Sequence, residues 1–340
     1  MATRGRLSRP GAVEVVADDG RLVSMTYAAP ARGLFLATAM RRVAEAILAD
    51  VERCRLRPAA VQGHKISIEG LATHQIATAL AIPYALSLQG DTDQKILSVR
   101  RDLWARYREV YLGAAAIFPF APWISRWCDA KLGSPAKPPI VLPCVLASDT
   151  ILPPRVTPVK IITAFHLESW RRKNVRTLLA AGAQLPELTL EIAGDGPDTA
   201  KDVIDAMIER EGMEGRARRI GYASSAMMQP WMNGAAAFAM PSLRETFGMV
   251  FAESLLAGCP IVYPAGRALD GYLEGCGFAL AVPSQDVTAV AEAIRTLIRD
   301  QERRKAELAR WQQSAAAAAF QRDAILSTYC NGLHTILQGH

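Results

Sequence analysis

The sequence predicts an α/β protein built from two doubly wound parallel-sheet domains. The chain has 340 residues, which suggests two domains, and half of them are hydrophobic. Short apolar runs alternate with amphipathic stretches along its whole length, and Ser148–Val159 carries three prolines without any periodicity, as a linker does. We therefore expect domains at 1–150 and 151–315, and a carboxy-terminal helix at 316–340 that packs back on the first domain.

In the first half, apolar runs of strand length are separated by stretches of helical periodicity. The expected strands are Leu22–Tyr27, Ala59–Gln62, Tyr84–Leu88, Ala115–Phe118 and Ile140–Leu142. The expected helices are Leu36–Val51, Gly70–Leu80, Ile96–Tyr111 and Pro122–Leu132. Proline suits the first turn of the last helix because its missing N–H would have no helical partner there.

The second half continues this alternation. The expected strands are Lys160–Ala164, Thr189–Ala193, Ala217–Ile220, Ala235–Met240, Ile261–Tyr263 and Ala279–Val282. The expected helices are Val175–Gly182, Ala200–Glu211, Ala226–Asn233, Met249–Ala257 and Val287–Arg299, followed by an Ala-rich helical stretch over Gln301–Leu337 with a break near Ser314. Apolar strands alternating with helices indicate parallel sheets that are covered on both faces.

The composition excludes several classes of protein. No apolar run approaches the ~20 residues of a membrane span, and no apolar core follows the basic segment Met1–Gly11, so a secretory signal is not expected. Six cysteines lie far apart without a C-x-x-C pair, at Cys54, Cys128, Cys144, Cys259, Cys276 and Cys330. We therefore expect reduced, mostly buried thiols in a cytoplasmic protein, rather than structural zinc or disulfides.

The excess of positive over negative charge is confined to the first half of the chain. Residues 1–155 contain 20 Lys and Arg against 13 Asp and Glu, whereas residues 156–340 contain 19 against 20. A basic half can attract anionic lipid at the inner face of a membrane or a diphosphate-linked acceptor, and it can equally be an ordinary solvated surface. Nucleic acid is not expected as a partner, because no zinc-finger, RNP or homeodomain-like pattern is present.

The strongest chemical signal is the stretch Ala239–Pro260, which reads AMPSLRETFGMVFAESLLAGCP. A buried strand is expected to end at Met240, and a helix to begin near Gly248 and to end at Gly258, where glycine suits a left-handed C-cap. The first turn of this helix offers free backbone N–H groups and the positive end of the helix dipole. A diphosphate placed there would be stabilised without a metal.

Two carboxylates accompany this helix, Glu245 in the loop before it and Glu253 within it. If the segment between them were mostly helical, they would lie roughly 12 Å apart, about the distance from the ribose to the sugar ring of a nucleotide sugar. Because a carboxylate accepts hydrogen bonds from paired hydroxyls, one glutamate could hold each end of such a ligand.

The Glu245-x7-Glu253 pattern in this context closely resembles the signature of the retaining GT-B glycosyltransferases of family 4, the glycosyl transferases group 1. The resemblance implies a GT-B fold, with two Rossmann-like domains that face a cleft and a nucleotide sugar bound mostly by the second domain. It further implies that Glu253 holds the ribose, that Glu245 holds the donor sugar, and that Thr246, Phe247, Gly248 and Met249 surround the diphosphate.

Two more segments resemble this family in the expected order. LEIAGDGPD, at Leu190–Asp198, resembles the family's strand and GDGP turn and includes Gly194. The segment from Arg218 to Ser242 resembles the strand that leads to the base site, so the backbone at Gly221 and Tyr222 is expected near the donor base. Taken alone, GDGP would indicate only a tight turn.

Lys173, in WRRKNVRTLLAA, resembles the lysine of the family motif that supplies an arginine and a lysine to the donor diphosphate. Its ammonium would neutralise charge on the departing phosphate. His166 stands where the family has the arginine. Arg171 or Arg172 could reach the phosphates instead, and His166 could equally be a partly buried residue at a strand end.

In the first half, Arg57–Asp93 resembles the family's acceptor-side stretch. Gln89 stands where the family has a histidine beside the reacting sugar, and an amide can bond a sugar hydroxyl but cannot change charge. Asp91-Thr92-Asp93 forms a D-x-D pattern, for which a helix N-cap or an acceptor contact is expected rather than a metal site. Met1–Leu56 resembles the family poorly, so the first domain is expected to lack its first βα unit, through a late assigned start or a naturally shorter form.

The resemblance implies a retaining, metal-independent glycosyltransferase that needs no cofactor. It would move a hexose to a glycan or lipid-linked acceptor in cell-surface polysaccharide or lipopolysaccharide synthesis, with peripheral contact at the inner membrane through the basic first domain. Two alternatives remain open: a non-catalytic or partner-dependent GT-B subunit, and a GT-B nucleotide-sugar epimerase. The nucleotide, the sugar, the acceptor and the oligomeric state are not readable from the sequence.

Overall fold

The computed structural model describes residues 13–18, 22–28 and 35–338, and the chain forms two compact units. Unit 1 comprises residues 1–120, 124–142 and 328–340, and unit 2 comprises residues 121–123 and 143–327. The chain thus passes into unit 2 after Leu142 rather than near residue 150, and the segment from 316 to 327 belongs to unit 2. Among the described residues, no helix is long and apolar enough to cross a membrane.

Unit 2 contains a six-stranded, all-parallel sheet in the order β11-β10-β9-β6-β7-β8. Its strands are β6 (Lys160–Ala164), β7 (Thr189–Ala193), β8 (Ala217–Gly221), β9 (Ala237–Ala239), β10 (Ile261–Pro264) and β11 (Ala279–Val282). All six strands predicted in the second half are present, and three of them have the predicted bounds. The middle residues of β6, β7 and β9 are buried, as expected for strands that helices cover on both faces.

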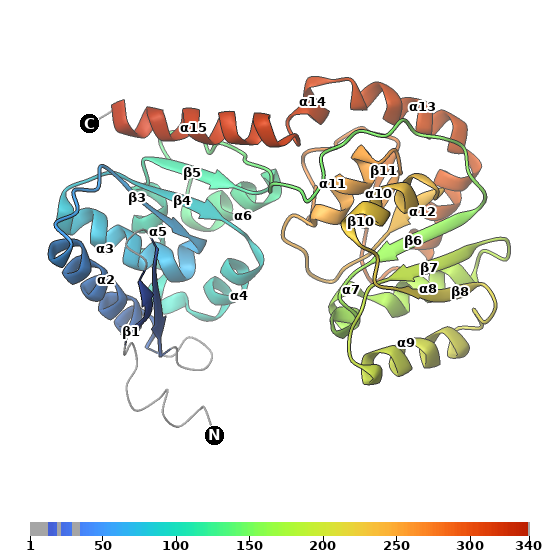
Figure 1. Ribbon diagram of the computed structural model, residues 1–340, viewed down its shortest axis with the longest axis horizontal. Helices are drawn as coiled ribbons and strands as arrows, with labels where there is room; N and C mark the ends of the chain where they lie inside the picture. Colours follow the sequence, from blue (N-terminus) through green and yellow to red (C-terminus); the bar gives the residue numbers. More distant parts are fainter. Residues whose placement is uncertain (1–12, 19–21, 29–34, 339–340) are drawn as a thin grey trace. The chain divides into compact units, whose positions relative to one another are not determined.

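Helices connect these strands, as Figure 1 shows. They are α7 (Trp170–Lys173), α8 (Val175–Ala183), α9 (Asp198–Arg210), α10 (Ser225–Asn233), α11 (Met249–Leu256) and α12 (Val287–Arg299). The tail forms α13 (Gln301–Gln312), α14 (Ala315–Ala318) and α15 (Arg322–Gln338). The predicted break near Ser314 is confirmed, because its hydroxyl accepts from the N–H of Ala317 and caps α14. A second break follows α14 and was not predicted.

The linker Ser148–Val159 forms neither helix nor strand, as predicted, but buried side chains hold it against unit 2. Lys305 is 3% exposed, and its ammonium donates to the carbonyl oxygens of Arg155 (2.5 Å) and Ala235 (2.8 Å). Gln312 donates to the carbonyl of Leu152 at 3.1 Å. Burial lowers the pKa of Lys305 to about 8. The linker is therefore a fixed strap on this unit.

Unit 1 has a three-stranded parallel sheet and a separate two-stranded antiparallel ribbon. The sheet consists of β3 (Val61–His64), β4 (Tyr84–Leu88) and β5 (Ala116–Pro119), and the ribbon of β1 (Val13–Asp18) and β2 (Val23–Tyr27). The expectation that Leu22–Tyr27 would join a parallel sheet is therefore wrong. The reason is local: β2 pairs with the strand directly before it in the chain.

The predicted strand Ile140–Leu142 is also wrong. The N–H groups of Ile140 and Leu142 do donate to β5 carbonyls at 2.8 and 2.9 Å, yet no strand forms. Prolines at 138, 139 and 143 flank this segment, and a proline has no N–H with which to extend a ladder.

The helices of unit 1 are α2 (Leu36–Arg53), α3 (Gly70–Leu80), α4 (Asp91–Val99), α5 (Trp104–Leu112) and α6 (Pro122–Leu132). The single helix predicted for Ile96–Tyr111 is wrong, because the chain breaks at Arg100 (φ −96°, ψ 59°). The Arg100 guanidinium bonds both carboxylate oxygens of Asp102, at 2.8 and 2.6 Å, across a short 3-10 turn. From Thr328 onward α15 belongs to unit 1, where the Tyr329 hydroxyl donates to the side-chain oxygen of Gln62.

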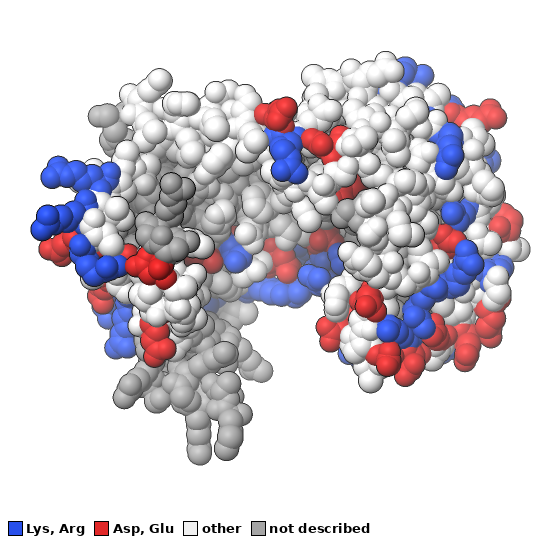
Figure 2. Space-filling model, viewed as in Figure 1, with Lys and Arg blue, Asp and Glu red and all other residues white. Residues whose placement is uncertain are grey.

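The basic surplus of the first half does not form a surface of one sign on the face that Figure 2 shows. Acidic side chains lie among the Lys and Arg residues at the margin of unit 1 where Figure 1 places α2. On α2 itself, Arg41 pairs with Glu45 and Arg53 pairs with Asp50.

All six cysteines are free thiols in this structure. The expectation that most would be buried is wrong, because only Cys128 and Cys259 are buried while Cys54 and Cys330 are exposed.

Candidate active site

The strand order of unit 2 places a topological switch point between β6 and β9. From β6 the chain continues to β7 and β8 on one side, whereas β9, β10 and β11 follow on the other side. In open parallel sheets, ligands bind at such a point, outside the carboxyl ends of the strands. The loop after β6 carries His166 and Lys173, and the loop after β9 carries Glu245 to Gly248. Two predicted site residues and one predicted site segment thus leave the same sheet edge.

Lys173 and Glu245 meet directly at this edge. The Lys173 ammonium lies 2.5 Å from the Glu245 carboxylate, and the two side chains are 13% and 11% exposed. The two residues are 72 positions apart in the sequence, so the fold brings them together. In such a pair, the ammonium can bind an anion while the carboxylate accepts hydrogen bonds from sugar hydroxyls.

Asn174 fastens the lysine loop to the glutamate loop. It adopts a left-handed conformation (φ 58°) between α7 and α8, and its amide donates to the carbonyls of Pro241 (3.1 Å) and Ser284 (2.5 Å). The N–H of Leu243 also donates to the carbonyl of Arg172 at 2.9 Å. The position of Lys173 relative to Glu245 is therefore fixed by backbone contacts as well as by the ion pair.

The start of α11 is shaped by Gly248, which has φ 70°. A Cβ at this position would lie 2.6 Å from Cδ2 of Phe251 and 3.0 Å from Cγ of Glu245, so only glycine fits. Within the described chain, the N–H groups of Phe247 and Gly248 make no hydrogen bond. The loop and the first turn of α11 therefore keep free donors for an anion.

The four residues expected around the diphosphate differ in what they expose. The Phe247 side chain is 1% exposed and packs against Tyr272 and Phe320, so only its backbone is available to a ligand. Met249 is 46% exposed. The Thr246 carbonyl is occupied by the indole N–H of Trp123, a contact that sequence reasoning missed.

Glu253 lies one turn into α11 and lines a small hollow with Met228, Met232 and Ala147. Its carboxylate accepts from the N–H of Ala147 at 3.2 Å. Burial raises the pKa of the Glu253 carboxyl, and the Ala147 N–H opposes that rise. Because α11 begins only at Met249, the segment from Glu245 to Glu253 is not mostly helical, so the 12 Å separation does not follow.

His166 and Arg172 are more open than the ion pair. His166 is exposed, with Nδ1 at 3.7 Å from the carboxylate of Glu168, so the alternative of a partly buried histidine is wrong. Arg172 is exposed and donates to the Ser169 hydroxyl at 3.3 Å. Arg171 stacks on the ring of Trp170. Neither arginine is paired with Glu245 among the described contacts.

The GDGP turn follows β7 and packs under the loop that carries His166. A Cβ on Gly194 (φ 141°) would lie 1.9 Å from the carbonyl oxygen of Phe165, which explains the glycine. The Gly194 N–H donates to the carbonyl of Gly221 at 2.8 Å. The neighbouring Tyr222 is 73% exposed. Gly194 thus supports the loops of the site through its backbone.

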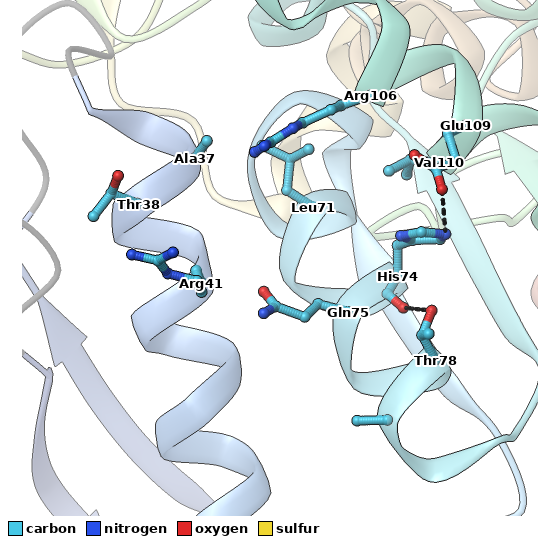
Figure 3. A pocket seen from close by; sticks show the side chains of 11 residues that line it. Ala37, Thr38, Arg41, Leu71, His74, Gln75, Thr78, Arg106, Glu109 and Val110 are labelled. Carbon is cyan, nitrogen blue, oxygen red and sulfur yellow. Dashed lines mark hydrogen bonds and ion pairs between the residues drawn. The ribbon is translucent and has the colours of Figure 1, made fainter.

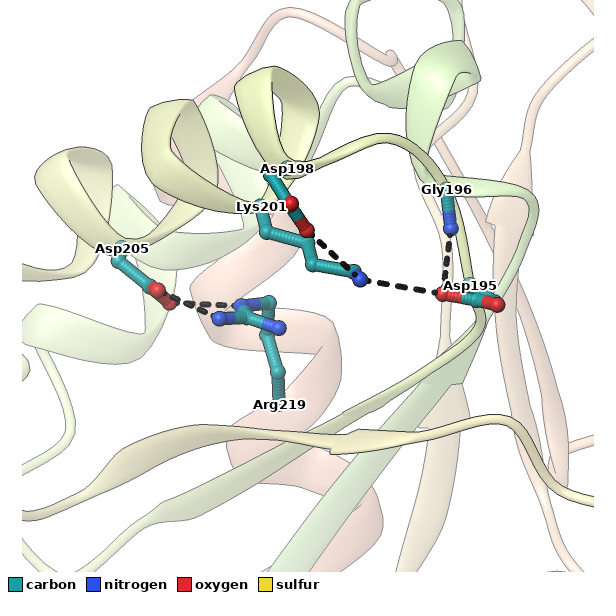
Figure 4. A network of polar contacts seen from close by, with 6 residues as sticks. All are labelled: Asp195, Gly196, Asp198, Lys201, Asp205 and Arg219. Atoms are coloured by element: carbon teal, nitrogen blue, oxygen red, sulfur yellow. Dashed lines mark hydrogen bonds and ion pairs between the residues drawn. The ribbon is translucent and has the colours of Figure 1, made fainter.

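Figure 4 shows the charged contacts that brace this turn. The Lys201 ammonium lies 3.1 Å from Asp198 and 3.5 Å from Asp195. The N–H of Gly196 donates to Asp195 at 2.8 Å and, with Lys201, lowers the pKa of the Asp195 carboxyl. Arg219 of β8 bonds both carboxylate oxygens of Asp205 on α9. These surface contacts fasten α9 to the turn and to β8.

In unit 1, Gln89 follows β4 and precedes Gly90, which has φ 95° and begins α4. The D-x-D pattern lies in the first turn of α4. The expected N-cap role is wrong, because Gly90 is the N-cap and no side chain caps it. Asp93 is fully buried and accepts from the backbone N–H (2.9 Å) and the hydroxyl (2.6 Å) of Ser67. Burial raises the pKa of Asp93 to about 6.

A hollow of about 600 Å³ in unit 1 has none of the predicted site residues in its lining (Figure 3). It lies between α2, α3 and α5, and its lining includes Arg41, His74, Arg106 and Glu109. Among residues 13–18, 22–28 and 35–338, no group of three or more His, Cys, Asp and Glu side chains is arranged to hold a metal ion.

Parts of this chain resemble known proteins. Residues 159–300 match the family described as glycosyl transferases group 1. The chain is 28% identical over 158 residues to a lipopolysaccharide core biosynthesis glycosyltransferase of Rhizobium meliloti, covering 46% of this chain and 45% of that protein. It is 29% identical over 143 residues to the O-antigen chain mannosyltransferase B of Escherichia coli, covering 41% and 37%. The chain thus spans less than half the length of these relatives.

Solved structures agree in fold over most of the chain. Sucrose-phosphate synthase of Thermosynechococcus elongatus has a TM-score of 0.72 at 18% identity, covering 96% of this chain and 86% of that one. Anabaena HepE in complex with UDP has a TM-score of 0.69 at 15% identity, covering 86% and 82%. The chain therefore has a GT-B fold, and its residues 159–300 match the glycosyl transferases group 1.

Proposed function

We propose that this protein is a retaining glycosyltransferase that moves a hexose from a nucleotide sugar to a glycan or lipid-linked acceptor. The observation that carries the proposal is the meeting of Lys173 and Glu245 at the switch point, beside the free N–H groups of Phe247 and Gly248. One edge of one sheet thus offers an ammonium, a carboxylate and unpaired amides. An anionic group and a sugar joined to it need this combination.

In this proposal, the donor diphosphate lies at the start of α11, where the free amides and Lys173 neutralise the charge that develops as it departs. Glu245 accepts hydrogen bonds from the sugar, and Glu253 accepts them from the ribose. The acceptor oxygen forms a bond to the anomeric carbon on the face from which the diphosphate leaves. The acceptor proton passes to the departing phosphate oxygen. Lys173 and the amides supply the positive charge, so we propose that transfer needs neither a metal nor a cofactor.

The relatives support a role in cell-surface polysaccharide or lipopolysaccharide synthesis. One is described as a lipopolysaccharide core biosynthesis glycosyltransferase and another as an O-antigen chain mannosyltransferase. Anabaena HepE has been crystallised with UDP-glucose, which supports a nucleotide sugar as the donor. We further propose a cytoplasmic protein whose basic first half contacts the inner face of the membrane.

The test begins with thermal-shift measurements on the full chain with UDP-, GDP-, ADP- and TDP-sugars. A donor at a hundred times its dissociation constant should stabilise the fold by about 2.7 kcal/mol. Transfer from that donor to lipid-linked and glycan acceptors is then measured for the wild type, for Glu245→Ala and for Glu214→Ala, an exposed glutamate far from the site in the sequence. Glu245→Ala should lose transfer and Glu214→Ala should keep it. Full transfer by Glu245→Ala would disprove the assignment.

A second function is favoured by one residue. Gln89 cannot exchange a proton, so the chain could bind a nucleotide sugar as a subunit that transfers it only with a partner. Donor binding without transfer by the isolated chain, and transfer once a partner subunit is added, would select this function. Restored transfer in Gln89→His alone would support it further.

A further inference from the structure

Trp123 belongs to unit 2 although the rest of α6, from Ile124 onward, belongs to unit 1. Its side chain is 4% exposed. The indole N–H lies between two carbonyl oxygens of unit 2, at 3.1 Å from Thr246 and 3.2 Å from Ala268. The guanidinium of Arg267 lies over the indole ring, 5.7 Å from its centre. One side chain thus contacts two separate loops.

Both loops leave the carboxyl edge of the sheet, one after β9 and the other after β10. The second loop holds Ala268 in a left-handed conformation (φ 55°) although it is fully buried. An alanine adopts this conformation only where its surroundings hold it, and the bond from Trp123 to its carbonyl is one such restraint. The indole therefore stabilises a loop geometry that the backbone alone disfavours.

The contact with Thr246 sets the direction of one particular peptide group. In a trans peptide, the C=O of one residue and the N–H of the next point in opposite directions. Because the Thr246 carbonyl faces Trp123, the N–H of Phe247 faces away from it. That N–H makes no hydrogen bond in the described chain. The Phe247 ring packs against the rings of Tyr272 and Phe320.

We propose that Trp123 is a positioning residue for the donor diphosphate. By holding the Thr246 carbonyl, it presents the N–H of Phe247 and the start of α11 to the phosphates, and it ties this loop to the loop at Ala268. The inference rests on the proposed function and deepens it. It assigns the orientation of the anion-binding N–H groups to a residue more than a hundred positions earlier in the chain.

The variant Trp123→Phe removes the N–H donor and keeps an aromatic ring in the buried space. Trp104→Phe is the matched control, since its indole N–H also donates to a backbone carbonyl, that of Leu97 at 2.7 Å, but in unit 1. Two readouts are needed. The first is hydrogen exchange without ligand at the N–H groups of Phe251 and Tyr272, which bond Gly248 and Leu269 within the two loops.

The second readout is the affinity of the full chain for UDP, GDP, ADP and TDP and for the corresponding monophosphates. In Trp123→Phe, we expect both amides to exchange about tenfold faster and the preferred diphosphate to bind about tenfold more weakly, the equivalent of one lost hydrogen bond. The preference for diphosphate over monophosphate should shrink. A purely structural role would leave that preference unchanged. Trp104→Phe should match the wild type in every measurement.

Unchanged exchange in Trp123→Phe would overturn the inference whatever the ligand does. Faster exchange with unchanged diphosphate affinity would also overturn it, because the loops would then loosen without consequence for the phosphates. If the wild type binds none of the four diphosphates, the proposed donor site itself is wrong and the inference falls with it. Comparing the wild type with its variants therefore separates the two failures.

Discussion

Replacing Gly248 by alanine tests how tightly the start of α11 is constrained. The residue has φ 70°, and an added Cβ would lie 2.6 Å from the ring of Phe251. That ring is fully buried and packs edge-on against Phe238, with ring centres 5.5 Å apart, so it has no room to move. Alanine would therefore meet two penalties, one from its own backbone and one from its neighbour.

The two penalties can be separated with a matched glycine. Gly212 has φ 66°, but a Cβ there would meet nothing within 4 Å, so Gly212→Ala carries the backbone penalty alone. That penalty is roughly 1–2 kcal/mol, and overpacking in a core adds roughly 1–3 kcal/mol. Gly248→Ala should therefore lower the free energy of unfolding by about 2–5 kcal/mol, and Gly212→Ala by about 1–2 kcal/mol.

Thermal unfolding of the full chain measures both variants, since 1 kcal/mol shifts the melting temperature by about 2–4 °C in a unit of this size. Gly248→Ala should also lose donor binding, because the new methyl group lies against Cγ of Glu245. Equal melting temperatures for the two variants would refute the reasoning, since they would show that the Phe251 ring moves aside without lowering the free energy of unfolding.

Three further predictions concern both units. Burial raises the pKa of Asp93 to about 6 in the native chain, whereas the unfolded chain releases the proton near the ordinary pKa of 3.8. The native state therefore binds more protons between these values, and this group destabilises the fold as pH rises from about 4 to 6. Between these pH values, the free energy of unfolding of Asp93→Asn, measured in urea, should therefore rise by roughly 3 kcal/mol relative to that of the wild type. A difference in free energy of unfolding that does not change with pH would contradict this. Asn174→Gly keeps the left-handed backbone but loses the three hydrogen bonds of the side chain, so it should lower the free energy of unfolding by about 1–3 kcal/mol and weaken donor binding. A neutral effect on both would show that the ion pair alone positions the loop. Co-sedimentation with phosphatidylglycerol vesicles should fall as salt rises from 50 to roughly 300 mM, and equal binding to phosphatidylcholine vesicles would disprove a charge-driven membrane contact.

The fold of unit 2 was largely predictable because most of its strands are short runs rich in apolar residues between recognisable helix signals. Lys160–Ala164 and Thr189–Ala193 were predicted to the residue for this reason. The errors in unit 1 arise where a local contact overrides the pattern. At Arg100 the helix ends, and the guanidinium makes a bidentate bond to Asp102. For β2, periodicity predicted the strand but not its antiparallel pairing with β1.

For the site, the sequence motif predicted a set of residues but not how they meet. Lys173 and Glu245 were both expected at the donor, and their ion pair became visible only in the structure. Trp123 could not have been found, because an indole 123 positions before Thr246 carries no local signal. His166 stood where an arginine was expected, and the structure places it in the open rather than beside the ion pair.

The strap at Ser148–Val159 has a practical consequence for anyone wishing to excise the donor domain. The segment that matches the family ends at residue 300, yet Lys305 and Gln312, which hold the strap, come from α13 beyond it. A fragment cut at the homology boundaries would leave the Ala235 carbonyl without its ammonium partner and would remove α13, which contacts α11 and α12. Unit 2 is therefore longer than the region that similarity defines, because it extends from residue 143 to residue 327 and also includes residues 121–123 with Trp123.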